Sequence, residues 1–298
     1  MQVCDPMLSH RLLDQHTHAV VNRLQNPQPP FGLPALPIVP HGFSNEAHLF
    51  PWLLPLHEGI ADVTSRRRLL DEIDAATARD ASETPQAPCV LMLADCEASS
   101  ESLTQHLASR SIATLATGDL AMLRWHDPAV LVQLRWMLHL SSWASLFGPI
   151  RRLTVWWKGG WYSFDRPEDA ACAWTRFDAK ETRLLHRIGQ INAVLKALGH
   201  QSRTTLIERS QAIDALLAVA ADRHGLHRAD DQVAFATHAL TVHPRFDHHP
   251  RIRALLAEIR AQGAEEDPQT YSDATALLQF DDWQQIGAEL RTLEESTP

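Results

Sequence analysis

The sequence predicts an α+β protein, in which an N-terminal mixed sheet flanked by helices precedes an all-helical C-terminal lobe. Apolar runs of strand length recur up to Phe164, and no strand pattern follows them. From Asp178 onward, apolar residues instead recur at the three- and four-residue spacings of helices. We therefore expect an α/β domain at residues 1–166 and a helical lobe at residues 167–298.

The composition is that of an ordinary soluble protein. The 298 residues are 45% apolar and 21% charged, and the net charge of −9 argues against nucleic-acid binding. No apolar run reaches the roughly 20 residues that span a bilayer, and the N-terminus lacks the apolar core of a signal peptide. The four cysteines are scattered without a CxxC pair, which is typical of a reducing compartment. We expect a cytoplasmic protein that does not contact membranes.

The secondary structure of the first domain is predicted from short apolar runs and from the glycine, proline and polar residues that end them. The run Cys89–Ala94 is continuously apolar, as in a central strand buried on both faces. Strands are expected at 17–24, 48–56, 89–94, 112–116, 120–125, 152–157 and 161–164, the last two forming a hairpin, and helices at 64–79 and 101–109.

The stretch from Leu120 to Ile150 contains the clearest helix start and stop signals in the chain. Asp127 is placed to cap a helix whose first residue is Pro128, and Phe147-Gly148-Pro149 is a stop signal. Arg124 should share a strand face with Leu120 and Met122. We expect it to be buried and paired with a carboxylate, Asp95 or Asp127.

The second lobe reads as helices throughout. Asp178-Ala-Lys-Glu181 is a capping-box pattern, and a periodic apolar face runs from there to Gly199. Further helices are expected at 206–223, 230–242, 250–262 and 282–294.

Catalytic and cofactor motifs are missing from the sequence. It contains neither a GxSxG elbow nor a Gly-rich phosphate loop. The carboxylates Asp95, Glu97 and Asp127 could form an acid–base set, but nothing in their spacing requires it. We predict no catalytic residue, no cofactor and no enzyme activity.

Histidines provide the alternative, a histidine-dependent metal hydrolase that uses His243, His248 and Asp247. The group HALTVHPRFDHHP also contains His238 and His249, but the gaps between its histidines are five, five and one. A single-helix zinc site needs ligands three or four apart, as in HExxH. The spacing favours a polar turn between two helices over a metal site.

Tryptophans are concentrated in the middle of the chain, with seven of the nine between Trp125 and Trp174. Trp156 and Trp157 are adjacent in a strand and must point to opposite faces of the sheet. Either a two-layer core buries both, or one is exposed as an interface anchor. We predict Trp156, Trp157 and Trp161 as partner-binding residues, with the two-layer core as the alternative.

Several of these segments, taken in order, resemble the adaptor–chaperone family of type VI secretion (Tap or TEC proteins, domain of unknown function 4123). LRWHDPAVL and LFGPI carry the resemblance through Arg124, Trp125, Asp127, Pro128, Val130, Phe147, Gly148 and Pro149. LFPWLLPL, with Pro51, Trp52 and Leu53, and the tail segment with Phe246 and Pro250 are also similar to this family. The resemblance covers residues 17–165 well and the remainder loosely. The family's Arg after Asp-Pro is Ala129 here, so its role does not carry over.

This resemblance implies a non-enzymatic protein of the bacterial cytoplasm. Such a protein binds a toxin effector and helps load it onto the spike protein, of the VgrG type, so its expected partners are those two proteins. The residues of the shared motif are expected to be structural.

Overall fold

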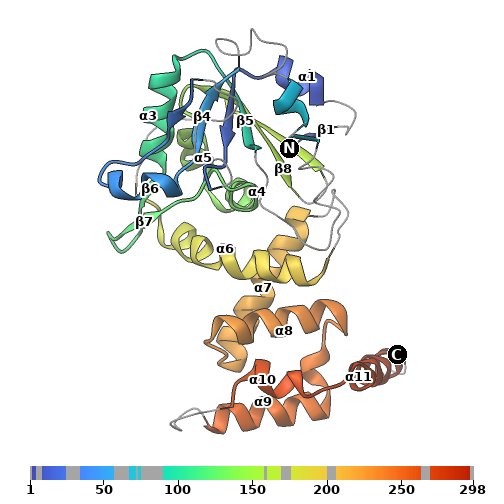
Figure 1. Cartoon of the computed structure of the whole chain (residues 1–298). Helices are drawn as coiled ribbons and strands as arrows, with labels where there is room; N and C mark the ends of the chain where they lie inside the picture. Colours follow the sequence, from blue (N-terminus) through green and yellow to red (C-terminus); the bar gives the residue numbers. More distant parts are fainter. Residues whose placement is uncertain are drawn as a thin grey trace. The chain divides into compact units, whose positions relative to one another are not determined.

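The computed structural model describes residues 2–4, 9–24, 34–56, 67–71, 73–74, 90–157, 160–168, 176–199, 206–262 and 269–295. They form two units, which we call unit 1 (Met1–Leu185) and unit 2 (His186–Pro298) (Figure 1). This division falls within helix α6, Ala179–Ala197. The boundary predicted at residue 166 stays a prediction, since residues 169–175 lie outside the described part.

A seven-stranded sheet is the framework of unit 1. Its strand order is β1-β9-β8-β5-β2-β4-β3, and every neighbouring pair is antiparallel. The strands are β1 (Gln2–Cys4), β2 (His18–Val21), β3 (Leu36–Pro37), β4 (Trp52–Pro55), β5 (Val90–Cys96), β8 (Ile150–Trp157) and β9 (Gly160–Asp165). The predicted α+β class is confirmed, although the sheet is antiparallel rather than mixed. Because β5 and β8 are antiparallel, β8 begins at the same end of the sheet at which β5 ends, and the helices lie in the connection between them.

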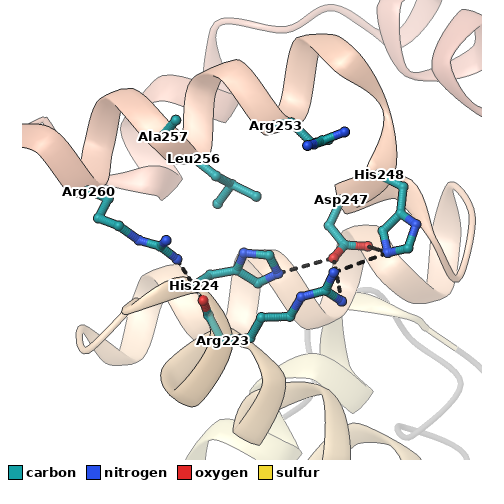
Figure 2. A pocket seen from close by; sticks show the side chains of 8 residues that line it. All are labelled: Arg223, His224, Asp247, His248, Arg253, Leu256, Ala257 and Arg260. Carbon is teal, nitrogen blue, oxygen red and sulfur yellow. Dashed lines mark hydrogen bonds and ion pairs between the residues drawn. The ribbon is translucent and has the colours of Figure 1, made fainter.

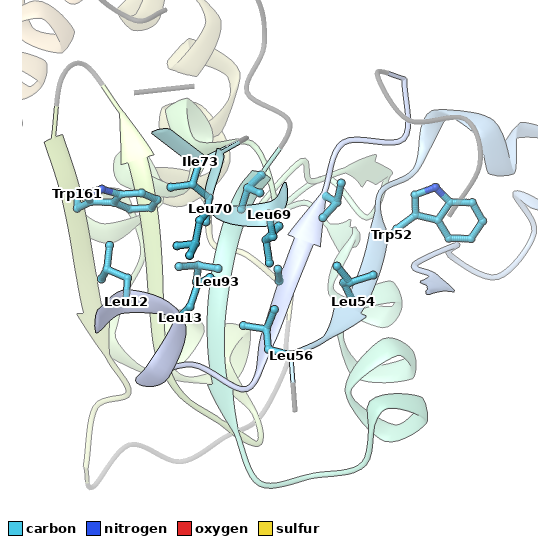
Figure 3. Close-up of a cluster of buried hydrophobic side chains, with 13 residues drawn as sticks. Leu12, Leu13, Trp52, Leu54, Leu56, Leu69, Leu70, Ile73, Leu93 and Trp161 are labelled. Carbon is cyan, nitrogen blue, oxygen red and sulfur yellow. The ribbon is translucent and has the colours of Figure 1, made fainter. Parts of the chain in front are cut away.

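One face of the sheet packs against two N-terminal helical segments, α1 (Ser9–Asp14) and residues 67–71 with 73–74. Alternate residues of the strands point to this face, and Figure 3 shows their apolar side chains meeting those of the helices. This cluster contains Leu12, Leu13, Ala19, Val21, Trp52, Leu54, Leu56, Leu69, Leu70, Ile73, Val90, Leu93 and Trp161. The predicted helix 64–79 is helical where it is described, at 67–71 and 73–74.

The other face of the sheet is covered by three later helices. Helices α4 (Pro128–Met137) and α5 (Leu140–Phe147) contact β8, and α3 (Ser100–Arg110) contacts β3 and β4. The ring of Trp143 in α5 lies 5.6 Å, between centroids, from that of Phe164 in β9. Because both faces are covered, β5 is apolar and buried along most of its length, as its sequence predicts.

A separate two-stranded sheet links α3 to α4. It pairs β6 (Ile112–Thr114) with β7 (Leu120–Met122), which is shorter than the predicted strand 120–125. Leu120 and Met122 are exposed on β7, by 72% and 46%.

The described residues of unit 2 form helices joined by turns and short connections. Its helices after α6 are α7 (Leu206–His224), α8 (Ala229–Thr241), α9 (Pro250–Gln262), α10 (Tyr271–Ala276) and α11 (Phe280–Glu295), with a 3-10 turn η4 at Phe246–His248. Phe235, Phe246 and Tyr271 form the centre of its core. The predicted helices are confirmed, but α10 was not predicted because six residues are too few to show a periodicity. No helix in the described ranges has the length and apolarity needed to cross a membrane.

Candidate functional site

Asp127 caps α4 as its sequence position predicts. Its Oδ1 atom accepts a hydrogen bond from the backbone N–H of Ala129 at 3.0 Å, and Pro128 occupies the first helical turn. Arg124 donates to the Asp127 Oδ2 atom at 2.8 Å, so one of the two predicted partners is confirmed. The predicted burial of Arg124 is wrong, since 63% of its side chain is exposed. Arg124 lies beyond the end of β7, and Leu120 and Met122 of that strand are likewise exposed.

Replacing Asp127 with alanine should lower the free energy of unfolding by about 1 kcal/mol, because the first turn of α4 loses its cap. Asp127→Asn should cost less, since an asparagine oxygen can still accept from the Ala129 N–H. Arg124→Ala should cost at most about 1 kcal/mol, as for other exposed ion pairs. Urea unfolding of the three variants measures this. An Asp127→Asn loss as large as that of Asp127→Ala would show that the ion pair, not the cap, stabilises this turn.

Trp125 and His126, between Arg124 and Asp127, face the interior. The Trp125 indole N–H donates to the Leu107 carbonyl oxygen at 3.2 Å and the Ser111 hydroxyl at 3.1 Å. Burial lowers the pKa of His126 to about 4, with a smaller opposing effect of Asp127. His126 is therefore neutral at pH 7. The segment joins β7 to α4 by packing and capping.

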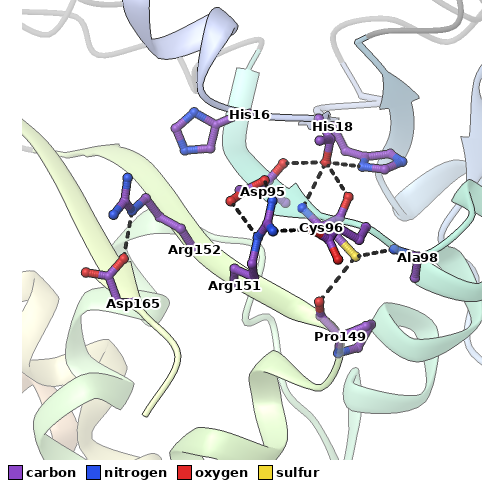
Figure 4. Close-up of polar contacts among 12 residues, drawn as sticks. His16, His18, Asp95, Cys96, Ala98, Pro149, Arg151, Arg152 and Asp165 are labelled. Atoms are coloured by element: carbon purple, nitrogen blue, oxygen red, sulfur yellow. Dashed lines mark hydrogen bonds and ion pairs between the residues drawn. The ribbon is translucent and has the colours of Figure 1, made fainter. Parts of the chain in front are cut away.

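The carboxylates considered as an acid–base set are held by different arginines. Arg151 binds Asp95 through two hydrogen bonds of 3.0 Å and also binds Glu97 (Figure 4), whereas Asp127 binds Arg124. Arg152, the next residue of β8, pairs with Asp165 across the β8–β9 hairpin at 2.7 Å. The contacts of Arg151 and Arg152 are ion pairs at the end of the sheet.

The predicted partner-binding tryptophans lie in the β8–β9 hairpin. Trp157 and Trp161 are buried, while Trp156 is half-buried and packs against the apolar cluster that contains Trp161. The Trp156 and Trp161 rings meet edge to face, with centroids 5.4 Å apart. None of the three is exposed, which favours the two-layer core over an exposed anchor. Their role in partner binding stays a prediction.

The histidines in and around the η4 turn form hydrogen bonds or ion pairs with different acidic residues. His243 faces Glu294 at 3.4 Å, whereas His224 donates to the Asp247 Oδ2 atom at 3.1 Å. Burial opposes ionisation of Asp247, but the His224 hydrogen bond, with His248 and Arg223 nearby, lowers its pKa. Among the described residues, no three histidine, cysteine or acidic side chains converge as metal ligands. The geometry thus gives no support to a hydrolase using His243, His248 and Asp247.

An exposed apolar surface lies at the start of α11. Phe280 is 74% exposed, and Leu277, three residues earlier, is 72% exposed. Beside them is a pocket of about 440 Å³ between α8 and α11, whose lining includes Phe280, Trp283 and Val242. We call Leu277, Phe280 and this pocket the Phe280 surface. A pocket of this volume is large enough to admit side chains of another molecule.

One wall of the Phe280 surface is built from stacked and hydrogen-bonded rings. His238 stacks on Trp283 with ring centroids 4.1 Å apart, and its Nδ1 atom lies 2.9 Å from the Tyr271 hydroxyl. Burial lowers the pKa of His238 to about 4, so it stays neutral in this stack at pH 7. A preformed wall reduces the conformational entropy that a partner must remove on binding.

Part of the chain matches a known domain family. Residues 39–145 match the model of a domain family described as Domain of unknown function (DUF4123). This is the domain family that the motifs resemble, over a shorter range than the 17–165 expected from them. The match includes Arg124, Asp127 and Pro128 and ends just before Phe147-Gly148-Pro149. No curated protein and no solved structure matches the chain significantly.

Proposed function

We propose that this protein is an adaptor that binds a toxin effector of type VI secretion in the cytoplasm and helps load it onto the spike protein. The observation that carries the proposal is the match of residues 39–145 to DUF4123, together with the ordered motifs that extend beyond it. The proposed role is binding, with no catalysis by this chain.

Exposed apolar residues on both units support binding to another protein. Unit 1 exposes Leu120 and Met122 side by side on β7, and unit 2 exposes Leu277 and Phe280. Aromatic and large apolar side chains of this kind often contribute most of the binding energy at protein interfaces. We assign the effector contact to the Phe280 surface, because there an exposed aromatic ring adjoins a pocket.

Co-expression tests the adaptor role directly. The chain, with an affinity tag, is produced with the toxin encoded by the neighbouring gene, or with the spike protein, and each complex is isolated by pull-down and size-exclusion chromatography. We expect a stable complex with the toxin and a second with the spike protein. Failure to retain either partner would contradict the proposal.

Replacing Phe280 with serine should weaken effector binding about 10- to 30-fold, the effect of losing an interface hot spot of roughly 1.4–2 kcal/mol. The melting temperature should hardly change, because the ring is 74% exposed. Leu293→Ser is the matched control: it lies on the same helix, is 59% exposed, and is about 20 Å further along the axis. Isothermal titration calorimetry with the purified effector measures both. Equal effects of the two substitutions would rule out the Phe280 surface as the contact.

A further inference from the structure

A second pocket of unit 2, of about 630 Å³, is lined by arginines from two helices. Arg223 lies at the end of α7, and Arg253 and Arg260 lie on α9 (Figure 2). Asp247 of η4 is the only carboxylate among the residues that line this pocket. Three arginines against one carboxylate leave an excess of positive charge, in a chain whose net charge is −9. We call this pocket the arginine pocket.

The carboxylate of Asp247 already has partners within unit 2. It accepts from His224 at 3.1 Å and lies 3.5 Å from the Arg223 guanidinium, so it neutralises that arginine. Arg260 donates to the carbonyl oxygen of Arg223, a neutral partner. Within the described ranges, Arg253 forms no side-chain hydrogen bond or ion pair. Arg253 and Arg260 therefore keep positive charges that no carboxylate of the described residues balances.

The distance between Arg253 and Arg260 along α9 indicates how far apart the two charges of the pocket lie. Arg260 follows Arg253 by seven positions on α9, a rise of about 10.5 Å or roughly two turns, so both lie on one side of the helix. Between them, Leu256 and Ala257 line the pocket, and Leu256 belongs to the buried core. The pocket thus has an apolar floor with a positive charge toward each end. Arg253 and Arg260 are both exposed to solvent, so a ligand can reach them from outside.

We infer that the arginine pocket binds an acidic segment of a partner protein, with a carboxylate at each arginine and apolar atoms over Leu256. Carboxylates three residues apart in a polyproline II segment lie on the same side of the chain and are separated by about 9 Å, which is close to the arginine spacing. Arginine pairs with carboxylates through charge-assisted, often bidentate, hydrogen bonds. This inference goes beyond the adaptor proposal, because it rests on unit 2 alone and can be tested without effector or spike.

Fluorescence anisotropy of the full-length protein tests the assignment. The probe is a fluorescein-labelled ten-residue peptide of serines and glycines with two glutamates three positions apart, and a second peptide carries glutamines instead. We expect the glutamate peptide to bind at least about 10-fold more tightly at low salt, and Arg253→Gln with Arg260→Gln to remove this preference. Arg228→Gln is the matched control, since it removes an exposed positive charge of unit 2 outside the pocket.

Three outcomes would overturn the inference. The first is equal binding of the two peptides, and the second is an equal loss in Arg228→Gln and in the double variant. The third is inorganic pyrophosphate binding to the pocket while the glutamate peptide does not, which would assign the pocket to phosphate ligands. Arg253→Gln alone is measured as well, because Arg253 has no side-chain partner within the described part and its loss should not disturb folding.

Discussion

Trp161→Ala is expected to lower the free energy of unfolding of unit 1 by about 3–5 kcal/mol, the usual cost of deleting a buried aromatic ring. Trp161 is only 3% exposed, and it belongs to the apolar cluster between the sheet and the two N-terminal helical segments (Figure 3). Its truncation would leave a cavity in this cluster and remove the edge-to-face contact with Trp156. Urea unfolding followed by far-UV circular dichroism measures the loss. Hydrogen exchange of residues 150–157 assigns it to unit 1.

Two controls separate packing from partner binding. Trp161→Phe keeps most of the buried apolar volume and should cost clearly less. Leu120→Ala removes a side chain that is 72% exposed and should change stability by less than about 0.5 kcal/mol. If Trp161→Ala instead left unfolding unchanged but abolished retention of the effector, the interface role predicted from the sequence would be right. The packing argument would then be wrong.

Local signals in the sequence identified helix boundaries well. The capping box Asp178–Glu181 is present in full: the Glu181 N–H donates to Asp178 Oδ1 at 2.7 Å, and the Asp178 N–H donates to Glu181 Oε2 at 3.1 Å. Asp127 likewise caps α4. Such features involve residues within one turn of each other, so a single stretch of sequence contains all the information needed to predict them.

Burial was harder to predict, because it depends on what covers each face. Strand alternation predicted that Arg124 is buried on the face of Leu120 and Met122, but β7 ends at Met122 and all three side chains are exposed. The same alternation left Trp156 and Trp157 undecided between core and surface. Sequence reasoning also missed the arginine pocket. The seven-residue spacing of Arg253 and Arg260 is visible in the chain, but Arg223 reaches them only through the packing of α7 and α9.

Gly148→Ala is expected to destabilise unit 1 by about 2–6 kcal/mol, for two separable reasons. Gly148 ends α5 with φ of 52° and ψ of −113°, a mirror image of extended backbone that residues with a Cβ atom avoid. An added Cβ would also overlap the imidazole of His106. That ring is held in place by a hydrogen bond, which its Nε2–H group donates to the Leu146 carbonyl oxygen at 2.9 Å. Backbone strain of about 1–3 kcal/mol and overpacking of a similar size should therefore add.

A double-mutant cycle separates the two contributions. His106→Ala removes the overlap but not the strain, so Gly148→Ala in that background should cost only about 1–3 kcal/mol. Gly42→Ala is the matched control for strain alone, because Gly42 has φ of 89° and, apart from its chain neighbours, no atom of the described residues lies within 4 Å of an added Cβ. If Gly148→Ala proved no more costly than Gly42→Ala, the imidazole would not be fixed against the turn. The Phe147-Gly148-Pro149 stop signal would then reflect backbone geometry alone, and not the contact that joins the end of α5 to α3.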